Sequence, residues 1–206
     1  MAVDVEVQVK QLVEAGVPEA VGLDADRFTE LAAGLSVEDG DVLAVHPSTA
    51  PPSALAALLR LDGKAGFVVE DMTDLDEFAP IEGLSLPDRP LYVLRGVQRG
   101  DEMANWSPEE ALPSITAAGR WPLTVNEGIS WLLQRPEVLE RNRCFMTVGS
   151  RKPKGSGLDT RVPALWISNG TGRDGKQNRH APKVGWCWAG NRHTWLGFAS
   201  TAARAG

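Results

Sequence analysis

The residues best suited to chemistry gather between Val184 and Ala199, in the stretch VGWCWAGNRHTWLGFA. This stretch holds three of the seven tryptophans, one of the three histidines and one of the two cysteines of the sequence. Indole rings can stack on a base, a sugar or a cationic group, and an imidazole can exchange protons near neutral pH. The stretch therefore indicates a binding or catalytic site near the end of the sequence.

A β-hairpin would bring these side chains together. Trp, Val, Cys, Thr and Phe favour a half-buried strand, and Gly190-Asn191 suits a two-residue type II′ turn. Because opposite residues share a face, this register gathers four rings on one face, namely Trp186, Trp188, His193 and Trp195. A three-residue turn from Gly190 to Arg192 would instead put His193 on the face of Cys187. We favour the two-residue turn, in which this thiol and this imidazole cannot form a dyad.

The turn itself carries polar groups. Asn191, Arg192 and His193 could hold a small anionic or polar ligand beside the indole rings, and Arg151 could reach in from a preceding basic loop. The predicted ligand-binding residues are Trp186, Trp188, Asn191, Arg192, His193, Trp195 and Arg151. The alternative is that the rings belong to the core, because tryptophan is large and mostly buried.

Two residues are candidates for catalysis. His193 could act as acid or base, and Cys144 could assist if the fold brings its thiol next to His193 or His180. A buried free cysteine in a strand is the more frequent role for such a residue. The set Cys144, His180, Cys187 and His193 lacks the close paired spacing of zinc sites, so we expect neither a metal nor a cofactor.

Charge is divided unevenly along the chain. Residues 1–142 carry 10 Lys+Arg and 25 Asp+Glu, a balance of −15, whereas residues 143–206 carry 11 Lys+Arg and 2 Asp, a balance of +9. The basic part could meet a phosphorylated small molecule or another polyanion. The interpretation that we favour is that the two parts neutralise each other within one fold. The overall charge of −6 argues against non-specific nucleic-acid binding, so nucleic acid is a less favoured partner.

An acidic run, EDMTDLDE, follows a predicted strand between Glu70 and Glu77. Its five carboxylates could hold Mg²⁺, although such runs more often form a solvated acidic face. A glycine-rich basic loop from Gly149 to Gly157 could cradle an anion but lacks the GxxxxGK[ST] pattern of a P-loop, and we favour a mobile, solvated loop.

Periodicity and capping signals predict an α+β fold. Helices are expected at residues 3–16, after Asp24, at residues 53–60, and after the capping-box residues Ser107 and Thr124. Strands are expected at residues 41–45, 65–69, 90–94, 143–148 and 162–167, and the first two with residues 53–60 suggest a β-α-β unit. We therefore predict a mixed or antiparallel sheet that is flanked by helices and ends in the C-terminal β-hairpin.

The length of 206 residues suits one domain spanning residues 1–206. Within it, residues 1–36 predict a helical pair that could form an appendage, and residues 143–206 form a basic, strand-rich part. No run of about 18 apolar residues predicts a membrane span, and the start MAVDVEVQVK lacks the basic and apolar regions of a signal peptide. Two widely spaced cysteines fit reduced thiols, so we expect a cytoplasmic protein.

Four segments carry a resemblance to a known family: VQVKQLVEAGVPEAVGL, CFMTVGSR, VPALWIS and APKVGWCWAGNRHTWLGFAS. They resemble a family of small actinobacterial proteins catalogued only as a domain of unknown function. The resemblance spans most of the chain and is most specific at GWCWAGNRHTWLG. It implies a cytoplasmic α+β protein with no established activity and a shorter link where this chain has Gly170 to His180.

Three classes of function follow from these observations. The first is a domain that binds a small anionic or polar ligand through the Trp/His-rich stretch. The second is an enzyme of the transferase or hydrolase type with His193 as acid or base. The third is a protein–protein interaction module whose tryptophans form a core or an interface. The sequence predicts no oligomeric state.

Overall fold

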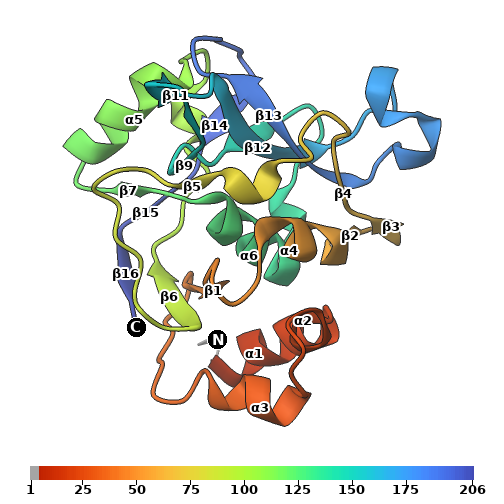
Figure 1. The fold of residues 1–206 in the computed structure, drawn as a ribbon, viewed down its shortest axis with the longest axis vertical. Helices are drawn as coiled ribbons and strands as arrows, with labels where there is room; N and C mark the ends of the chain where they lie inside the picture. Colours follow the sequence, from red (N-terminus) through yellow and green to blue (C-terminus); the bar gives the residue numbers. More distant parts are fainter. Residues whose placement is uncertain (1–4) are drawn as a thin grey trace.

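Short apolar strands and capped helices give the chain an α+β architecture, which confirms the predicted fold class (Figure 1). The computed structural model describes residues 5–206. The α-helices are α1 (Val5–Glu14), α2 (Val17–Ala20), α3 (Ala25–Glu30), α4 (Pro52–Leu58), α5 (Pro108–Ala117) and α6 (Val125–Gln134). Short 3₁₀ helices are η1 (Leu75–Glu77), η2 (Asp101–Met103), η3 (Pro136–Val138), η4 (Gly172–Asp174) and η5 (Lys176–Asn178).

The strands are short and numerous. Those before α6 are β1 (Val42–Val45), β2 (Arg60–Leu61), β3 (Lys64–Ala65), β4 (Phe67–Val68), β5 (Ala79–Pro80), β6 (Leu91–Arg95) and β7 (Trp121–Pro122). Those after it are β8 (Cys144–Met146), β9 (Ser150–Arg151), β10 (Pro153–Lys154), β11 (Gly157–Leu158), β12 (Arg161–Ile167), β13 (Pro182–Trp188), β14 (Leu196–Phe198), β15 (Ser200–Thr201) and β16 (Ala203–Ala205). The concentration of strands after residue 143 agrees with the sequence pattern.

A five-stranded mixed sheet forms the centre of the fold, with the order β14-β8-β12-β13-β4. The strands β12 and β13 pair antiparallel along seven residues each, from Arg161 opposite Trp188 to Ile167 opposite Pro182. Strand β8 pairs antiparallel with β12, whereas β14 and β4 lie parallel to their neighbours β8 and β13. This sheet carries Cys144, Trp186, Cys187 and Trp188, and the segment between β13 and β14 carries Asn191, Arg192, His193 and Trp195.

Helices cover both faces of this sheet. On one face, α6 approaches so closely that a Cβ on Gly128 would lie 2.7 Å from the Thr147 methyl group. The apolar side chains of Phe145, Leu165 and Val184 belong to the core on that side. On the other face, α5 contributes Ala111 and Ile115 to a second cluster, whose sheet residues include Met146, Val162 and Phe198.

A three-stranded sheet, β1-β6-β16, lies between α6 and the N-terminal helices (Figure 1). The buried Gln8 side chain joins α1 to this sheet, because its amide donates to the Asp41 carbonyl (2.9 Å) and accepts from the Leu43 amide (2.6 Å). The predicted N-terminal helical pair is confirmed, with Asp24 capping α3 through a bond from the Arg27 amide. Val3 and Asp4 of the predicted first helix lie outside the described residues.

The predicted C-terminal hairpin is wrong in its pairing. Both strands exist, as β13 and β14, but β8 and β12 lie between them. The expected opposition of Trp188 with His193 and of Trp186 with Trp195 therefore does not occur, since Trp186 and Trp188 pair with β12. The predicted Gly190-Asn191 turn does not form either: the Asn191 amide donates to the Trp188 carbonyl (3.1 Å), which closes a turn over Ala189 and Gly190, and the chain then crosses the sheet. Long-range partners decided the strand order, and local turn chemistry did not.

The predicted β-α-β unit is also wrong. Strand β1 pairs antiparallel with β6, whereas β4 lies at the edge of the five-stranded sheet beside β13. The two strands on either side of α4 therefore belong to different sheets. Each found a partner more than 40 residues away in the sequence, which no local pattern could indicate.

Candidate functional site

A pocket of about 390 Å³ opens on the face of the central sheet that carries the second apolar cluster. Its floor includes Cys144 on β8, Ala164 on β12 and Cys187 on β13. The strand register places these three side chains on the same face. All three are small, and the sheet is therefore hollow at this place instead of filled by its own side chains.

Trp166 on β12 forms part of the pocket wall. Its indole ring lies over Gly185 of the neighbouring strand, where a Cβ would be only 2.6 Å from ring atom Cη2. The ammonium group of Lys183 lies 4.3 Å from the centroid of the same ring, which is a favourable cation–π distance. A glycine at position 185 is thus needed for this indole to lie close against β13.

Aromatic surface also comes from the segment that crosses the sheet between β13 and β14. The rings of His193 and Trp195 are stacked, with centroids 4.6 Å apart and planes 13° from parallel, and both residues line the pocket. The His193 carbonyl accepts from the Asn105 amide (2.9 Å), and the Trp195 carbonyl accepts from the Cys144 amide (2.9 Å). Trp195 is 51% exposed, so this wall can be reached from solvent.

The structure divides the predicted ligand-binding residues into two groups. Trp186, His193 and Trp195 line the pocket, and so do both cysteines. Four others lie outside its lining, namely Trp188, Asn191, Arg192 and Arg151. Trp188, Asn191 and Arg192 are separated from the pocket because the predicted hairpin does not form, whereas Arg151 was expected from a neighbouring loop and lies on β9.

The four residues outside the lining have other surroundings. Trp188 is exposed and packs edge-on against Trp186, with ring centroids 4.4 Å apart. Asn191 is exposed in the crossing segment, and Arg192 forms an ion pair with Glu110 of α5. Arg151 lies on β9 and donates to the Asp159 carbonyl (2.8 Å), and burial lowers the pKa of its guanidinium.

Sequence reasoning missed five lining residues besides Ala164 and Trp166. These are Asn142, Arg143, Ile167, Asn169 and Leu196. Most lie at or just beyond the ends of β8 and β12, two strands that the sequence did predict. In the antiparallel pair, the end of β12 lies beside the start of β8. Knowledge of this pairing would have indicated that residues from both strands meet at this edge of the sheet.

The thiol of Cys144 is not prepared for nucleophilic attack. Burial raises its pKa well above the ordinary value, and its Sγ donates to the Phe145 carbonyl (3.8 Å). Burial also raises the pKa of Cys187. Both side chains therefore remain thiols near neutral pH, whereas the thiolate is the reactive form. Within residues 5–206, no group of three or more His, Cys, Asp or Glu side chains is arranged to hold a metal ion.

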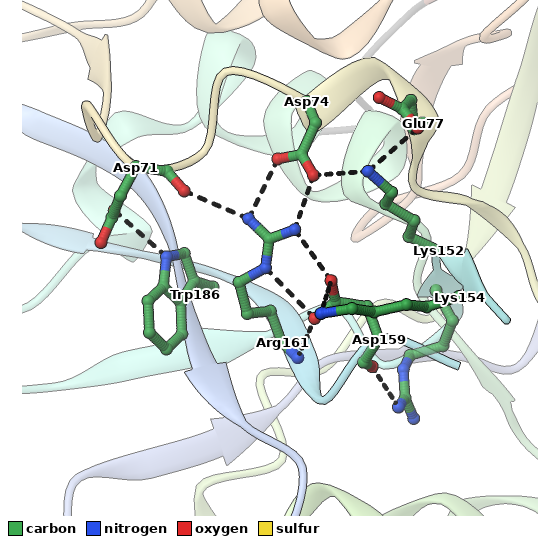
Figure 2. Close-up of polar contacts among 9 residues, drawn as sticks. Asp71, Asp74, Glu77, Lys152, Lys154, Asp159, Arg161 and Trp186 are labelled. Carbon is green, nitrogen blue, oxygen red and sulfur yellow. Dashed lines mark hydrogen bonds and ion pairs between the residues drawn. The ribbon is translucent and has the colours of Figure 1, made fainter. Parts of the chain in front are cut away.

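An ion-pair network lies beside the pocket and fastens the acidic run to the central sheet (Figure 2). The guanidinium of Arg161 donates to both carboxylate oxygens of Asp74 (3.0 and 2.6 Å) and to Asp159 (2.9 Å). Lys152 of the basic loop pairs with Asp74 (2.7 Å) and Glu77 (2.9 Å). The acidic run is therefore occupied by basic side chains from the C-terminal part, which favours mutual neutralisation over a magnesium site.

This network reaches the pocket wall through one tryptophan. The Trp186 indole Nε1 donates to an Asp71 carboxylate oxygen (3.2 Å), and the other oxygen of Asp71 pairs with Arg173 (Figure 2 shows the indole contact). The Asp71 carbonyl also accepts from Arg161 (3.1 Å). The acidic run thus helps to position Trp186 at the edge of the pocket.

The network should make the protein sensitive to acid. Hydrogen bonds from Arg161 lower the pKa of Asp159 to about 2 and hold that of Asp74 far below its usual range. A depressed folded-state pKa contributes stability above the unfolded value of about 4, and this stability is lost as the pH falls toward about 2. We expect the unfolding free energy of the wild type to exceed that of Asp159→Asn most at neutral pH. The difference should shrink below about pH 4. Urea titrations of both proteins at several pH values measure it, and a constant difference would contradict the role of Asp159.

The fold and the pocket define an α+β protein whose mixed central sheet carries a cavity of the size used for small molecules. The chain belongs to a family of proteins of unknown function (DUF5701), whose model matches residues 11–206. No curated protein and no solved structure matches the chain significantly. In the described residues 5–206, no helix is long and apolar enough to cross a membrane. The function must therefore be inferred from the pocket itself.

Proposed function

We propose that the protein binds a small polar or anionic ligand in the pocket on its central sheet. One observation carries this proposal: the stacked His193–Trp195 pair and Trp166 contribute aromatic surface to a cavity of about 390 Å³ with a floor of small side chains. Small-molecule sites are typically cavities of about 300–1,000 Å³ with mostly apolar walls and a few polar groups. A planar ring is the group that such walls stabilise best.

The polar part of the lining favours a neutral or negatively charged ligand. It consists of the Asn142 and Asn169 amides, the His193 imidazole and the two thiols, together with the exposed Arg143 guanidinium, which also pairs with Glu140 (3.4 Å). Aspartate and glutamate do not contribute to this lining. Amides and a guanidinium can donate to carbonyl, hydroxyl or phosphate oxygens, whereas a cationic ligand would find no counter-charge in the lining.

Catalysis is a less supported alternative. Its support is that Cys144 and His193 line the same pocket, so a shared substrate could contact both. Against it stands the raised pKa of the Cys144 thiol, which keeps the sulfur protonated. A catalytic role would therefore fall to His193 as acid or base, acting on a ligand held by the tryptophans. The interaction-module alternative rests on the exposure of Trp188 and Trp195.

Removing one aromatic wall should reduce ligand-induced stabilisation. We expect Trp195→Ala and His193→Ala each to weaken binding by about 5- to 100-fold, since a stacked ring is worth roughly 1–3 kcal/mol. A thermal-shift screen of nucleosides, nucleotides, phosphorylated metabolites and short nucleic acids finds the ligand, and titration calorimetry then measures the loss. The matched control is Trp121→Ala, an exposed tryptophan on β7 outside the lining, which should bind as the wild type does. Equal losses in all three variants, or no stabilisation by any compound, would overturn the proposal.

We also infer a cytoplasmic location in an actinobacterial cell, with GWCWAGNRHTWLG as the segment that marks the site. Support for the location comes from Cys144 and Cys187, which are both free thiols. Support for the segment is that Trp186, Cys187, His193 and Trp195 all line the pocket. The proposed source rests on the resemblance of the sequence segments alone.

A further inference from the structure

A second pocket of about 340 Å³ adjoins the first on the side of β13 and the loop after β12. The two pockets share three lining residues, Trp166, Asn169 and Trp186. Because both indoles and one amide serve both cavities, a ligand longer than a single ring could contact the two pockets together. The side chains that line the second pocket therefore indicate which chemical group is attached to the ring that the first pocket holds.

Charge in the second pocket is already balanced. Lys183 pairs with Asp174 (2.6 Å), and Arg173 pairs with Asp71. The side chains of Lys183 and Asp174 are each only 11% exposed, and Asp174 also accepts from the Ser168 hydroxyl (2.7 Å). A phosphate placed here would meet two carboxylates and would have to compete with them for the cations. Anions are therefore disfavoured at this end of the site.

A neutral group rich in hydroxyls fits the same lining better. Hydroxyls can donate to the carboxylates of Asp71 and Asp174 and accept from the Asn169 amide or the Thr171 hydroxyl without breaking an ion pair. The indole of Trp166, which lies between the two cavities, offers an apolar surface for the face of a sugar ring. The lining thus combines hydrogen-bonding groups with an aromatic platform.

We propose that the ligand has two joined parts, a planar heteroaromatic ring in the first pocket and an uncharged sugar in the second, as in a nucleoside that carries no phosphate. This inference rests on the proposed function and narrows it. Only a ligand with both parts uses the aromatic walls and the balanced polar pocket at once. The free ring, the free sugar and the phosphorylated compound each lack one of these matches.

The test compares matched probes on the full chain by titration calorimetry. The probes are adenine, adenosine, adenosine 5′-monophosphate, uracil, uridine, uridine 5′-monophosphate and methyl riboside. We expect one nucleoside to bind about tenfold or more tightly than its free base, its monophosphate and methyl riboside, a difference of about 1.4 kcal/mol. Asp174→Asn and Thr171→Val should each weaken nucleoside binding by about tenfold. Thr171→Val should leave binding of the free base unchanged because Thr171 lines only the second pocket, whereas Asp174 also pairs with the Lys183 that lies over Trp166.

Thr171 is exposed, so Thr171→Val keeps the fold and the test remains decisive even if Asp174→Asn is unstable. Lys176→Ala, in the same loop but outside both linings, is the control and should bind as the wild type does. If base and nucleoside bind equally and Trp195→Ala weakens both, the proposed function stands and the two-part ligand is overturned. Tighter binding of a monophosphate would likewise overturn the uncharged sugar. If neither these probes nor the compounds of the wider screen bind, both proposals fall.

Discussion

Arg204→Ala should lower the free energy of unfolding by about 3–5 kcal/mol, the range observed when one partner of a buried ion pair is removed. Arg204 on β16 donates through Nε and Nη2 to the two carboxylate oxygens of Glu127 on α6 (2.6 and 2.7 Å). The Glu127 residue is 0% exposed and the Arg204 side chain is 6% exposed. Without the guanidinium, the carboxylate keeps the Tyr92 hydroxyl as a donor (2.9 Å) but loses its counter-charge in a dry environment.

Urea-induced unfolding of the wild type and the variant measures this loss. The control is Arg27→Ala, which removes an exposed ion pair with Glu30 and should change stability by no more than about 0.5 kcal/mol. The double variant Arg204→Met with Glu127→Gln should recover much of the stability, because no uncompensated charge is left and glutamine can keep the capping box. A loss below about 1 kcal/mol for Arg204→Ala would show that water reaches the pair.

Arg161→Ala should have the next largest effect, a loss of roughly 3 kcal/mol. One guanidinium serves two carboxylates here, and the Asp159 side chain is only 3% exposed. Its removal leaves Asp159 and Asp74 close together, with Lys152 as the remaining cation on Asp74. Because the same guanidinium bonds the Asp71 carbonyl, the acidic run should also loosen from the sheet.

The matched control for Arg161→Ala is Lys154→Ala, which removes an exposed amine 3.6 Å from the same Asp159 carboxylate. It should change the unfolding free energy by at most about 0.5 kcal/mol. Arg161→Lys should recover only part of the loss, since an ammonium group cannot form the paired bonds of a guanidinium. Equal effects of Arg161→Ala and Lys154→Ala in urea titrations would mean that the network is solvated and weak.

Local hydrogen-bonding rules explain which parts of the fold the sequence could predict. The capping boxes at Ser107 and Thr124 are present as expected. The N-cap residue and the third helical residue are close in the sequence, so their hydrogen bonds do not depend on long-range contacts. Strands such as β8 and β12 were placed correctly from their apolar runs. Strand order was not predictable in this way, since β14 is attached to β8 by contacts that span about 50 residues.

The candidate site shows the same division. Its most unusual segment was recognised from composition, and His193 and Trp195 do line the pocket. Their neighbours Asn191 and Arg192 do not, because the segment crosses the sheet instead of turning back on β13. Asn142 and Arg143 line the pocket because of the register between β8 and β12, which cannot be predicted from a single sequence. Composition alone was enough to predict that the acidic and basic parts of the chain neutralise each other. The ion pairs of Lys152 and Arg161 with Asp74 support this prediction.

The crossing segment between β13 and β14 has a consequence for how such a site can change over time. Strand β13 pairs with β12 and β4, and strand β14 pairs with β8. Neither strand therefore needs the connecting segment to keep its register. Substitutions and length changes between Gly190 and Thr194 can therefore remodel one side of the cavity while the scaffold stays intact. Under the proposed function, proteins built on this scaffold can come to bind different ligands through changes in this one surface segment.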